Sequence, residues 1–507
     1  MRIESDKLSA LEEWQRVHPI AVLYFAAQAV KGLVTNIIVL VPIFIALRNA
    51  FDENPYRIVV LIVCVLLLFM LFAFGTWWTF QFRVYAGRVE IKRGIFKKLR
   101  LNLPFDKIQD VKIEQPFYYR LTNTRVVALD TAGSAKQEAN LVALSDAYAQ
   151  QLSETILASK AGYTETASNE PVTPDEAEPR ILNRRSLADL VLHGITNNRV
   201  WIILGVASPF IDDAIRQLDH WVAFVNLESL YSVDAVGLTL VLLHVTLTAI
   251  SIFILITLIS IVGAIVTFYD YTLLKDGSRL RRVSGLLTRY QVNLQLSRIQ
   301  HIEYKQDWLD NLFGRVNVTF KQISQQLEGV PDDQRSLLVP SVTKSESVEL
   351  GLHAFTHVNP FTQTYSPISK RFMLKYSLLA LLLTAVAGFV LFLESNNIWH
   401  SLIALVVYLV VQGMIGLRWY RWGYALDGDN IYVRSGLFGI RFDVCPLYKL
   451  QQAKYAQSAW QARTHLANTT LFYASGRFTI PMLPSVTAAN IIDRSLQNTE
   501  LSNKYWM

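Results

Sequence analysis

The sequence predicts an α + β membrane protein with six transmembrane helices in three pairs, each pair followed by a small β-barrel or sandwich that ends in a helix. Three observations lead to this prediction. Only 18% of the 507 residues are charged, whereas soluble proteins contain about 25%. Charged residues are absent from several long, contiguous apolar stretches. A short β-type pattern occurs three times, each time after such stretches.

The predicted spans are stretches that are long enough to cross about 30 Å of hydrocarbon. Four are uncharged and strongly apolar: residues 58–80, 237–268, 376–393 and 401–417. Two weaker stretches, 32–47 and 200–211, follow Lys31 and Arg199. These side chains can reach the interface from an amphipathic helix that lies along it. The alternative for these two weaker stretches is that they are buried helices of a soluble domain. If both are spans, the chain has six.

The distribution of Lys and Arg predicts the orientation of the spans. Basic residues are dense after the second, fourth and sixth spans and sparse in the connections within each pair. Because positive residues are retained on the cytoplasmic side, we expect the three large polar regions and both termini in the cytoplasm. The formal net charge of +7 then reflects topology and attraction to anionic lipid headgroups. We do not expect nucleic acid as a partner.

The repeated pattern has the same spacing in its three copies. Each copy starts with a glycine and two apolar residues, and 15 positions after the glycine comes the glutamine of a basic–apolar–glutamine triplet. A second glutamine follows six positions later. The glycines are Gly94, Gly285 and Gly436, the first glutamines are Gln109, Gln300 and Gln451, and the second are Gln115, Gln306 and Gln457. Such agreement without gaps indicates duplicated units.

Each copy is expected to form several strands followed by one helix. After the first glutamine, apolar and polar residues alternate with period two, which is typical of a half-buried strand. The glycine fits a hairpin turn. A serine (Ser145, Ser341 or Ser485) precedes the final helical stretch, where its hydroxyl could cap the helix. Antiparallel strands closed by one helix are the order of a pleckstrin-homology (PH) barrel.

Three segments of the sequence resemble a known family. They are LPFDKIQDVKIEQPFYYRL with VVALDTAGS in the first copy, LQLSRIQHIEYKQDWLDNLFGRVNV in the second and CPLYKLQQAKYAQSAWQARTHLANTTL in the third. On these segments the chain is similar to the YdbS-like family of bacterial PH-domain membrane proteins, in its long, YdbT-type form with three PH-like domains. The resemblance covers essentially the whole chain. It implies the PH-like fold and a place in the bacterial inner (cytoplasmic) membrane.

The domain boundaries follow from the spans and the copies. Residues 161–180 are acidic, contain proline and are poor in apolar residues, which is typical of a flexible linker. The predicted order is 1–80 (N-terminal segment and first span pair), 81–160 (first PH-like domain), 161–180 (linker), 181–268 (second span pair), 269–355 (second PH-like domain), 356–371 (linker), 372–417 (third span pair) and 418–507 (third PH-like domain).

The sequence contains no recognised catalytic or metal-binding motif. It has no phosphate-binding glycine loop, HExxH, CxxC or GxSxG. Cys64 and Cys445 are far apart and lack the companions of a metal site. His301 and Glu303 share one face of a strand, but no third ligand is evident, and we expect a surface pair. The prediction is a non-enzyme with no catalytic residues, no metal and no cofactor.

Two sets of residues are candidates for binding. The triplets predict an edge that contacts a phosphate or a carboxylate, and the alternative is that they only hold the strand geometry. Basic hairpin residues predict contacts with anionic lipid, worth about 1 kcal/mol each, and the alternative is that they only set topology. The triplet residues are Lys107, Gln109, Arg298, Gln300, Lys449 and Gln451, and the hairpin residues are Lys97, Lys98, Arg100, Arg281, Arg282 and Arg289.

The function expected from the sequence is a non-enzymatic scaffold in the bacterial inner membrane. Its three PH-like domains would bind proteins, each other or anionic lipid headgroups, and self-association is part of this expectation. A role in envelope stress or antimicrobial-peptide tolerance is compatible with the location. Two alternatives stay open at this point: a transporter or channel component that uses the six-span bundle, and a membrane enzyme whose site the sequence does not reveal.

Overall fold

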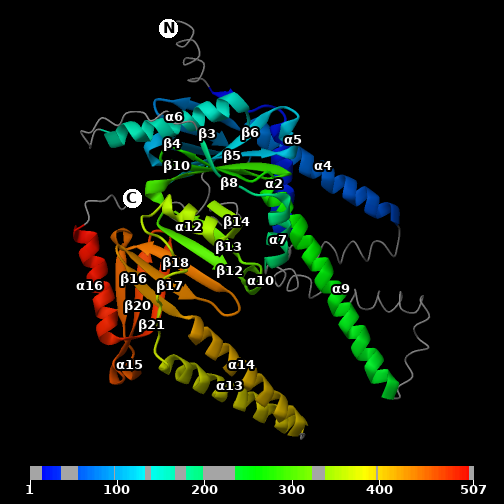
Figure 1. Ribbon diagram of the computed structural model, residues 1–507. Helices are drawn as coiled ribbons and strands as arrows, with labels where there is room; N and C mark the ends of the chain where they lie inside the picture. Colours follow the sequence, from blue (N-terminus) through cyan, green and yellow to red (C-terminus); the bar gives the residue numbers. More distant parts are fainter. Residues whose placement is uncertain are drawn as a thin grey trace. The chain divides into compact units, whose positions relative to one another are not determined.

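The computed structural model describes residues 14–35, 55–95, 98–131, 139–165, 179–197, 235–322, 337–395 and 398–501 (Figure 1). The chain divides into two compact units, which are described separately. Unit 1 comprises Met1–Asn183, Thr272–Leu294 and Gln325–Arg335, and unit 2 comprises Arg184–Tyr271, Gln295–Ser324 and Ser336–Met507. The second copy of the repeat therefore contributes strands to both units.

The elements occur in the same order in all three copies. The first copy contains β1 (Gln15–Arg16), α2 (Ala21–Thr35), α4 (Pro55–Thr79), β2 (Gln81–Tyr85), β3 (Arg88–Arg93), β4 (Leu99–Pro104), the 3₁₀ helix η1 (Phe105–Lys107), β5 (Ile108–Pro116), α5 (Phe117–Arg120), β6 (Thr124–Thr131), β7 (Ala139–Ser145) and α6 (Asp146–Glu165). The second contains β8 (Arg180–Arg184), α7 (Leu187–Thr196), α9 (Ala235–Phe268), β9 (Thr272–Asp276), β10 (Arg279–Ser284), β11 (Thr288–Gln295), η3 (Leu296–Arg298), β12 (His301–Gln306), α10 (Trp308–Leu312), β13 (Arg315–Lys321), β14 (Leu337–Thr343) and α12 (Lys344–Leu352). The third contains β15 (Ser366–Pro367), α13 (Arg371–Ser395), α14 (Ile398–Arg421), β16 (Gly423–Asp427), β17 (Asn430–Ser435), β18 (Ile440–Pro446), η4 (Leu447–Lys449), β19 (Gln452–Ala456), α15 (Ala459–Arg463), β20 (Leu466–Tyr473), β21 (Gly476–Pro484) and α16 (Ser485–Leu501).

Consecutive copies share their β-sheets. Unit 1 holds a four-stranded sheet, β1-β2-β3-β4, and a seven-stranded sheet, β7-β6-β5-β11-β10-β9-β8. Unit 2 holds a seven-stranded sheet, β14-β13-β12-β18-β17-β16-β15, and a three-stranded sheet, β19-β20-β21. Each seven-stranded sheet joins the last three strands of one copy to the first strands of the next copy, through the antiparallel pairs β5·β11 and β12·β18. We call these two pairs the junctions. The sequence predicted separate barrels and did not reveal the junctions.

The buried face of each strand follows the alternation of the sequence. In the first copy Val89 and Ile91 of β3 are buried together with Leu129 of β6 and Ile156 of α6, so the core lies between the two sheets and the helix. The third copy repeats this arrangement, with a core that includes residues of β17, β20, β21 and α16. This is a β-sandwich closed by a C-terminal helix.

The repeated glycine is required by the turn between the third and fourth strands of each copy. Gly94, Gly285 and Gly436 have φ angles of 117°, 121° and 153°, a region that residues with a Cβ rarely adopt. A Cβ on Gly436 would lie 2.0 Å from the carbonyl oxygen of Gly439, and one on Gly285 would lie 2.0 Å from that of Thr288. Sterics of the turn therefore explain why the glycine recurs.

A short strand precedes each helix pair and was not predicted: β1 and β15 are only two residues long, and β8 has five. In the first copy the indole Nε1 of Trp77, near the end of α4, donates to the carbonyl oxygen of Val17 at 3.2 Å. Trp419 of α14 donates in the same way to Ile368 at 3.0 Å. The end of the helix pair is thus tied to the segment that precedes it.

Two helices in the described part of the chain are long and apolar enough to cross a membrane. They are Arg371–Val390 in α13 and Leu402–Arg421 in α14, at the positions of two predicted spans, and they pack side by side (Figure 1). Shorter apolar segments, Leu67–Thr79 and Phe253–Phe268, lie in α4 and α9. The predicted span 200–211 and most of the span 32–47 lie outside the described residues. Six spans in three pairs therefore stay a prediction.

Two predicted helix caps are wrong. Ser485 is itself the first residue of α16 and does not precede it. In the second copy Thr343, not Ser341, caps the helix: its hydroxyl accepts from the Glu346 N–H at 3.3 Å, while the Glu346 carboxylate accepts from the Thr343 N–H at 2.8 Å. Ser341 is buried in β14 with a φ of 49°. In this copy the prediction failed because Ser341 and Thr343 are both acceptable caps, and the backbone conformation decides between them.

Candidate functional site

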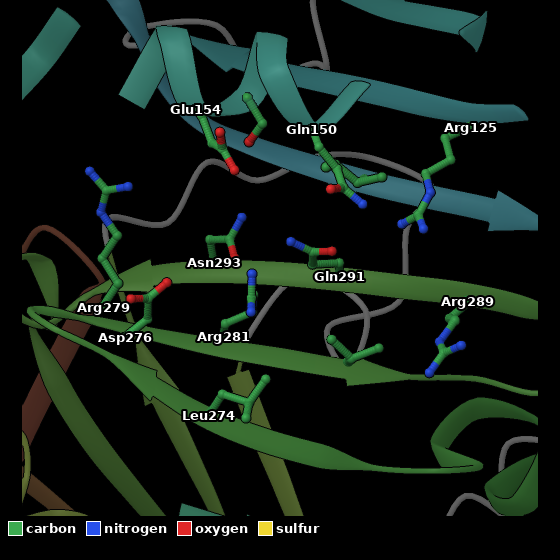
Figure 2. A pocket seen from close by; sticks show the side chains of 13 residues that line it. Arg125, Gln150, Glu154, Leu274, Asp276, Arg279, Arg281, Arg289, Gln291 and Asn293 are labelled. Atoms are coloured by element: carbon green, nitrogen blue, oxygen red, sulfur yellow. The ribbon is translucent and has the colours of Figure 1, made fainter. Parts of the chain in front are cut away.

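A polar cavity of about 370 Å³ lies in unit 1 between α6 and the seven-stranded sheet (Figure 2). Strands β9, β10 and β11 carry most of its lining, with single residues from β5 and β6. The lining residues are Ile113, Arg125, Gln150, Ser153, Glu154, Leu274, Asp276, Arg279, Arg281, Val283, Arg289, Gln291 and Asn293. Four arginines and two carboxylates are among them, and we call this site the arginine cavity.

Strand alternation places the polar side chains on one face of the sheet. Arg289 and Gln291 are two residues apart on β11, as are Arg279 and Arg281 on β10, and alternate residues of a strand point to the same side. Gln291 lies directly opposite Ile113 of β5. This pair belongs to the junction between the first and second copies. The cavity therefore depends on the sheet that the two copies share.

Helix α6 covers this face of the sheet. Gln150, Ser153 and Glu154 are three and four residues apart, which places them on one side of the helix. Figure 2 shows Gln150 and Glu154 directed from the helix towards the arginines of the sheet. The cavity thus has guanidinium, amide and carboxylate side chains on its sheet wall, and amide, hydroxyl and carboxylate side chains on its helix wall.

The charges of the cavity are only partly paired. Arg125 Nε lies 2.5 Å from Asp146 Oδ1, and Arg279 lies opposite Asp276 in the β9·β10 ladder. Arg281 Nε is buried and has no hydrogen-bond acceptor among the described residues. A buried donor without an acceptor costs about 1–3 kcal/mol. An anionic oxygen bound in the cavity would remove that cost and would form charge-assisted hydrogen bonds with the guanidinium groups.

The structure separates the predicted hairpin residues. Arg281 and Arg289 line the cavity. Arg282 points to the opposite face of β10 and is 0% exposed, which rules out a contact between its side chain and lipid headgroups. Lys98 and Arg100 are exposed, and Lys97 lies outside the described residues. Alternation along RLRRVS could have separated Arg282 from Arg281 at the sequence level.

The other polar residues of the cavity were not predicted from the sequence. Gln291 and Asn293 continue the two-residue period of Arg289 along β11, so a polar strand face was visible in the sequence. Arg125 and the α6 residues had no such signal, because their approach to β10 and β11 depends on the junction.

The basic residues of the three triplets do not share one environment. Lys107 has 68% of its side chain exposed and lies 3.9 Å from Asp106. Arg298 is half-buried and Lys449 is 2% exposed. The Gln300 N–H donates to the Lys321 carbonyl oxygen at 2.8 Å, and the Gln451 N–H donates in the same way to Phe472 at 2.9 Å. The backbone of Gln109 lies in β5. A common binding edge at the triplets stays a prediction.

Lys449 contributes to the packing of unit 2. Its Nζ donates to the carbonyl oxygens of Ser297 at 2.5 Å and Ile299 at 2.6 Å, so it ties η4 of the third copy to η3 of the second. Burial lowers the pKa of Lys449 to about 8. A side chain so enclosed has no room for an external phosphate, which favours the structural alternative at this triplet.

The second glutamine of the repeat also has a local role. The Gln306 side-chain amide donates to the Arg315 carbonyl oxygen, and that of Gln457 donates to Leu466, both at 2.8 Å. Each bond spans the short helix between two strands. This contact holds the turn closed and explains why the residue recurs.

His301 and Glu303 are joined by a third titratable side chain, which comes from the next copy. Glu303 lies opposite Asp443 of β18 in the second junction, and the potential ligand atoms of His301, Glu303 and Asp443 lie within 4.8 Å of one another. The expectation of a surface pair is wrong, because His301 is 4% exposed and Asp443 is 1% exposed. Burial lowers the pKa of His301 to about 3 and raises the pKa of Asp443 to about 7.

Two cations lie beside the carboxylates of this cluster. Arg441 Nε lies 2.9 Å from Asp443 Oδ2, and Lys321 Nζ lies 4.0 Å from Glu303 Oε2. His301 Nδ1 lies 2.6 Å from Ser475 Oγ. A metal ion would have to compete with both cations for the carboxylates, so we interpret the cluster as a buried polar network within the second junction.

Comparison with known proteins agrees with the repeat. The model of the bacterial PH domain family matches residues 29–160, 223–349 and 378–499. The chain is also similar to the UPF0699 transmembrane protein YdbT of Bacillus subtilis (strain 168), at 21% identity over 468 residues, which are 90% of this chain and 92% of the relative. No solved structure matches.

Proposed function

Because the chain is a membrane protein that belongs to the bacterial PH domain family, we propose that it is a non-enzymatic scaffold of the bacterial inner membrane. In this proposal six spans in three pairs hold three PH-like domains on the cytoplasmic side. The density of basic residues after the second, fourth and sixth predicted spans supports that orientation.

The ligand that we propose for the scaffold is a phosphate-bearing anion in the arginine cavity. The buried Arg281 Nε without an acceptor among the described residues carries this proposal. Arg289 lies on the same face, and arginine matches phosphate oxygens with two parallel N–H donors. The phosphate belongs either to a lipid headgroup or to a soluble molecule, and both sources present the same chemistry.

Thermal unfolding of the full-length protein in nanodiscs tests this proposal. We compare phosphatidylcholine nanodiscs, nanodiscs that contain phosphatidylglycerol, and phosphatidylcholine nanodiscs with added sn-glycerol 3-phosphate. A ligand present at 100 times its Kd stabilises a protein by about 2.7 kcal/mol. We therefore expect a raised unfolding midpoint in the second condition if the source is lipid, and in the third if it is a soluble phosphate.

Arg281→Gln should remove the stabilisation by the anion. Arg88→Gln is the matched control in the same unit, because Arg88 is exposed on β3 and does not line the cavity. If neither anion raises the midpoint, or if Arg88→Gln abolishes the shift as completely as Arg281→Gln, the cavity is not the binding site.

The proposed physiological role is tolerance of envelope stress. A scaffold that holds anionic groups at the cytoplasmic face would act where antimicrobial peptides disturb the membrane. A deletion strain should then be more sensitive to cationic antimicrobial peptides, and expression of the Arg281→Gln variant should fail to restore tolerance. If that variant fully restores tolerance, the cavity is not needed for the physiological role.

A further inference from the structure

Each junction pairs one particular edge of a copy with another particular edge of the next copy. The first partner is the strand after the first glutamine, which is β5 or β12, and we call this the C-edge. The second partner is the fourth strand of the following copy, which is β11 or β18, and we call this the N-edge. Three copies form two junctions, so one edge of each kind is left over.

The leftover edges are β19 and β4. Among the described residues β19 ends the three-stranded sheet and β4 ends the four-stranded sheet. β19 is the C-edge of the third copy and β4 is the N-edge of the first copy. Strands at a sheet edge carry unpaired backbone N–H and C=O groups, which can pair with another chain.

Both junctions have the same register when residues are counted from the repeat. In the first, Arg289 lies opposite Gln115, and in the second, Ile440 lies opposite Gln306. In each case the residue four positions after the glycine faces the residue six positions after the first glutamine. The same two edges of the repeat therefore pair in one register in both junctions.

Side chains on the free C-edge are exposed at positions that the junctions bury. Tyr455 comes four residues after Gln451, as Ile113 and Tyr304 come four residues after their glutamines. Ile113 is 1% exposed and Tyr304 is 0% exposed, whereas Tyr455 is 42% exposed. A strand paired with this edge would cover the Tyr455 side chain, as pairing covers the equivalent residues of the other two copies.

The free N-edge shows the same difference. Leu101 of β4 comes seven residues after Gly94 and is partly exposed. The equivalent residue Val292, which is in a junction, is 1% exposed. Apolar surface is thus available on both edges, as pairing between them requires.

We propose that β19 of one molecule pairs with β4 of a second copy of the same protein, in the register of the internal junctions. The inference deepens the scaffold role and rests on it, since it names the partner that the free edges would hold. The register pairs Leu103 with Gln452, Asn102 with Ala453, Leu101 with Lys454, Arg100 with Tyr455 and Leu99 with Ala456. Because the two edges differ, the contact is head-to-tail and extends into a ring or a filament.

The register also resolves an objection from charge. Lys454 and Arg100 are both basic, and a lysine on an edge strand often prevents uncontrolled pairing. In the expected register these two cations do not face each other: Lys454 faces Leu101 and Arg100 faces Tyr455. A shift of one residue that brings Lys454 opposite Arg100 loses this separation, so the charges favour the register found inside the chain over that shifted one.

Cysteine crosslinking of the full-length protein in native membranes tests the register. Ala453→Cys and Asn102→Cys are introduced into two differently tagged copies that are expressed together, and the isolated membranes are treated with an added oxidant that accepts the two electrons of disulfide formation. Directly opposed Cβ atoms lie about 4.5–5.5 Å apart, close to the range of a disulfide. Asn102→Cys is compared with Lys98→Cys, which is on the same strand face but about 13 Å further along.

We expect a covalent dimer that carries both tags, at a yield about tenfold higher for Asn102→Cys than for Lys98→Cys, because disulfide formation depends steeply on the Cβ separation. When both cysteines are placed in one chain, the expected product is a ladder of oligomers. A fast-migrating monomer in that experiment would show closure within one molecule and would overturn the proposal. So would equal yields for the two pairs, or a disulfide to a different protein only.

A charge exchange tests the contact without cysteines. Tyr455→Lys places two cations opposite each other and should weaken self-association about tenfold, since like charges directly opposite destabilise a strand pair. Adding Arg100→Glu should restore association, whereas Tyr85→Lys, a change at an exposed tyrosine of β2, should have no effect. Failure of the rescue would overturn the register. Retained anion binding at Arg281 would then leave the cavity proposal intact.

Discussion

Replacing Gly436 by alanine should destabilise the second junction. Gly436 has a φ of 153°, and a Cβ at this position would lie 2.0 Å from the Gly439 carbonyl oxygen. Real Cβ contacts are essentially never shorter than 3.0 Å, so the turn would have to open by about 1 Å. Gly439 directly precedes Ile440, the residue that faces Gln306 in the junction. Opening of the turn therefore displaces the start of β18.

The cost of this change combines two effects. A backbone conformation that is essentially restricted to glycine costs about 1–3 kcal/mol for another residue, and the displaced strand end loses about one hydrogen bond, worth roughly 1 kcal/mol. The sum is about 2–4 kcal/mol. Because 1.36 kcal/mol corresponds to a factor of ten, we expect amide exchange in the first residues of β18 to accelerate about 30-fold to several hundred-fold.

Hydrogen exchange followed by mass spectrometry on the protein in nanodiscs measures this effect. Gly428→Ala is the matched control: Gly428 has a φ of 55°, but nothing lies within 4 Å of its Cβ position, so the cost is only about 1 kcal/mol. Exchange in β18 that changes equally in both variants, or by less than about threefold in Gly436→Ala, would refute the steric explanation of the repeated glycine.

Two further predictions concern buried charges in unit 2. Lys449→Ala should lower the unfolding free energy by about 2–4 kcal/mol, because it leaves two buried carbonyl oxygens without their donor. Lys107→Ala, at the exposed equivalent position, should change the unfolding free energy by less than about 0.5 kcal/mol. Chemical denaturation measures both values, and equal effects would contradict the packing role of Lys449. The His301 and Asp443 pKa values predict opposite pH dependences. The folded-state pKa of His301 is lowered to about 3 from 6.5. Its contribution to the unfolding free energy is therefore lost as the pH falls below 6.5, and His301→Gln should remove this pH-dependent loss of stability. The folded-state pKa of Asp443 is raised to about 7 from 3.8. Its contribution to the unfolding free energy is therefore lost as the pH rises from 4 to 7, and Asp443→Asn should remove this pH-dependent loss of stability. Unfolding midpoints measured across this pH range test both signs, and unchanged profiles would show that neither group titrates on unfolding.

The repeat could be predicted because its signals are local in the sequence. The spacing from Gly436 to Gln451 reflects one turn, one strand and one 3₁₀ helix, and each of these is determined by neighbouring residues. Alternation after Gln300 predicted β12 for the same reason. The missed cap at Ser341 shows the limit of such signals, since two acceptable residues two positions apart differ only in the backbone conformation that the tertiary structure imposes.

The candidate site could be predicted only in part. Arg281 and Arg289 were identified as basic residues of a hairpin, but the sequence did not indicate that α6 of the preceding copy covers them. Arg282 was assigned the same role and is instead buried on the opposite face of its strand. The third member of the His301–Glu303 cluster, Asp443, is 140 residues away in the chain, and only strand pairing between copies brings it close.

The sequence by itself determined the membrane-protein class, the triplicate unit and the order of strands and helix within it, because hydropathy, period-two alternation and turn sterics act over a few residues. The tertiary structure decided which sheets are continuous, which arginines meet in a cavity and which edges stay open. These features depend on pairing between strands of different copies, and the residues on each side of such a pair carry no local signal that identifies their partner.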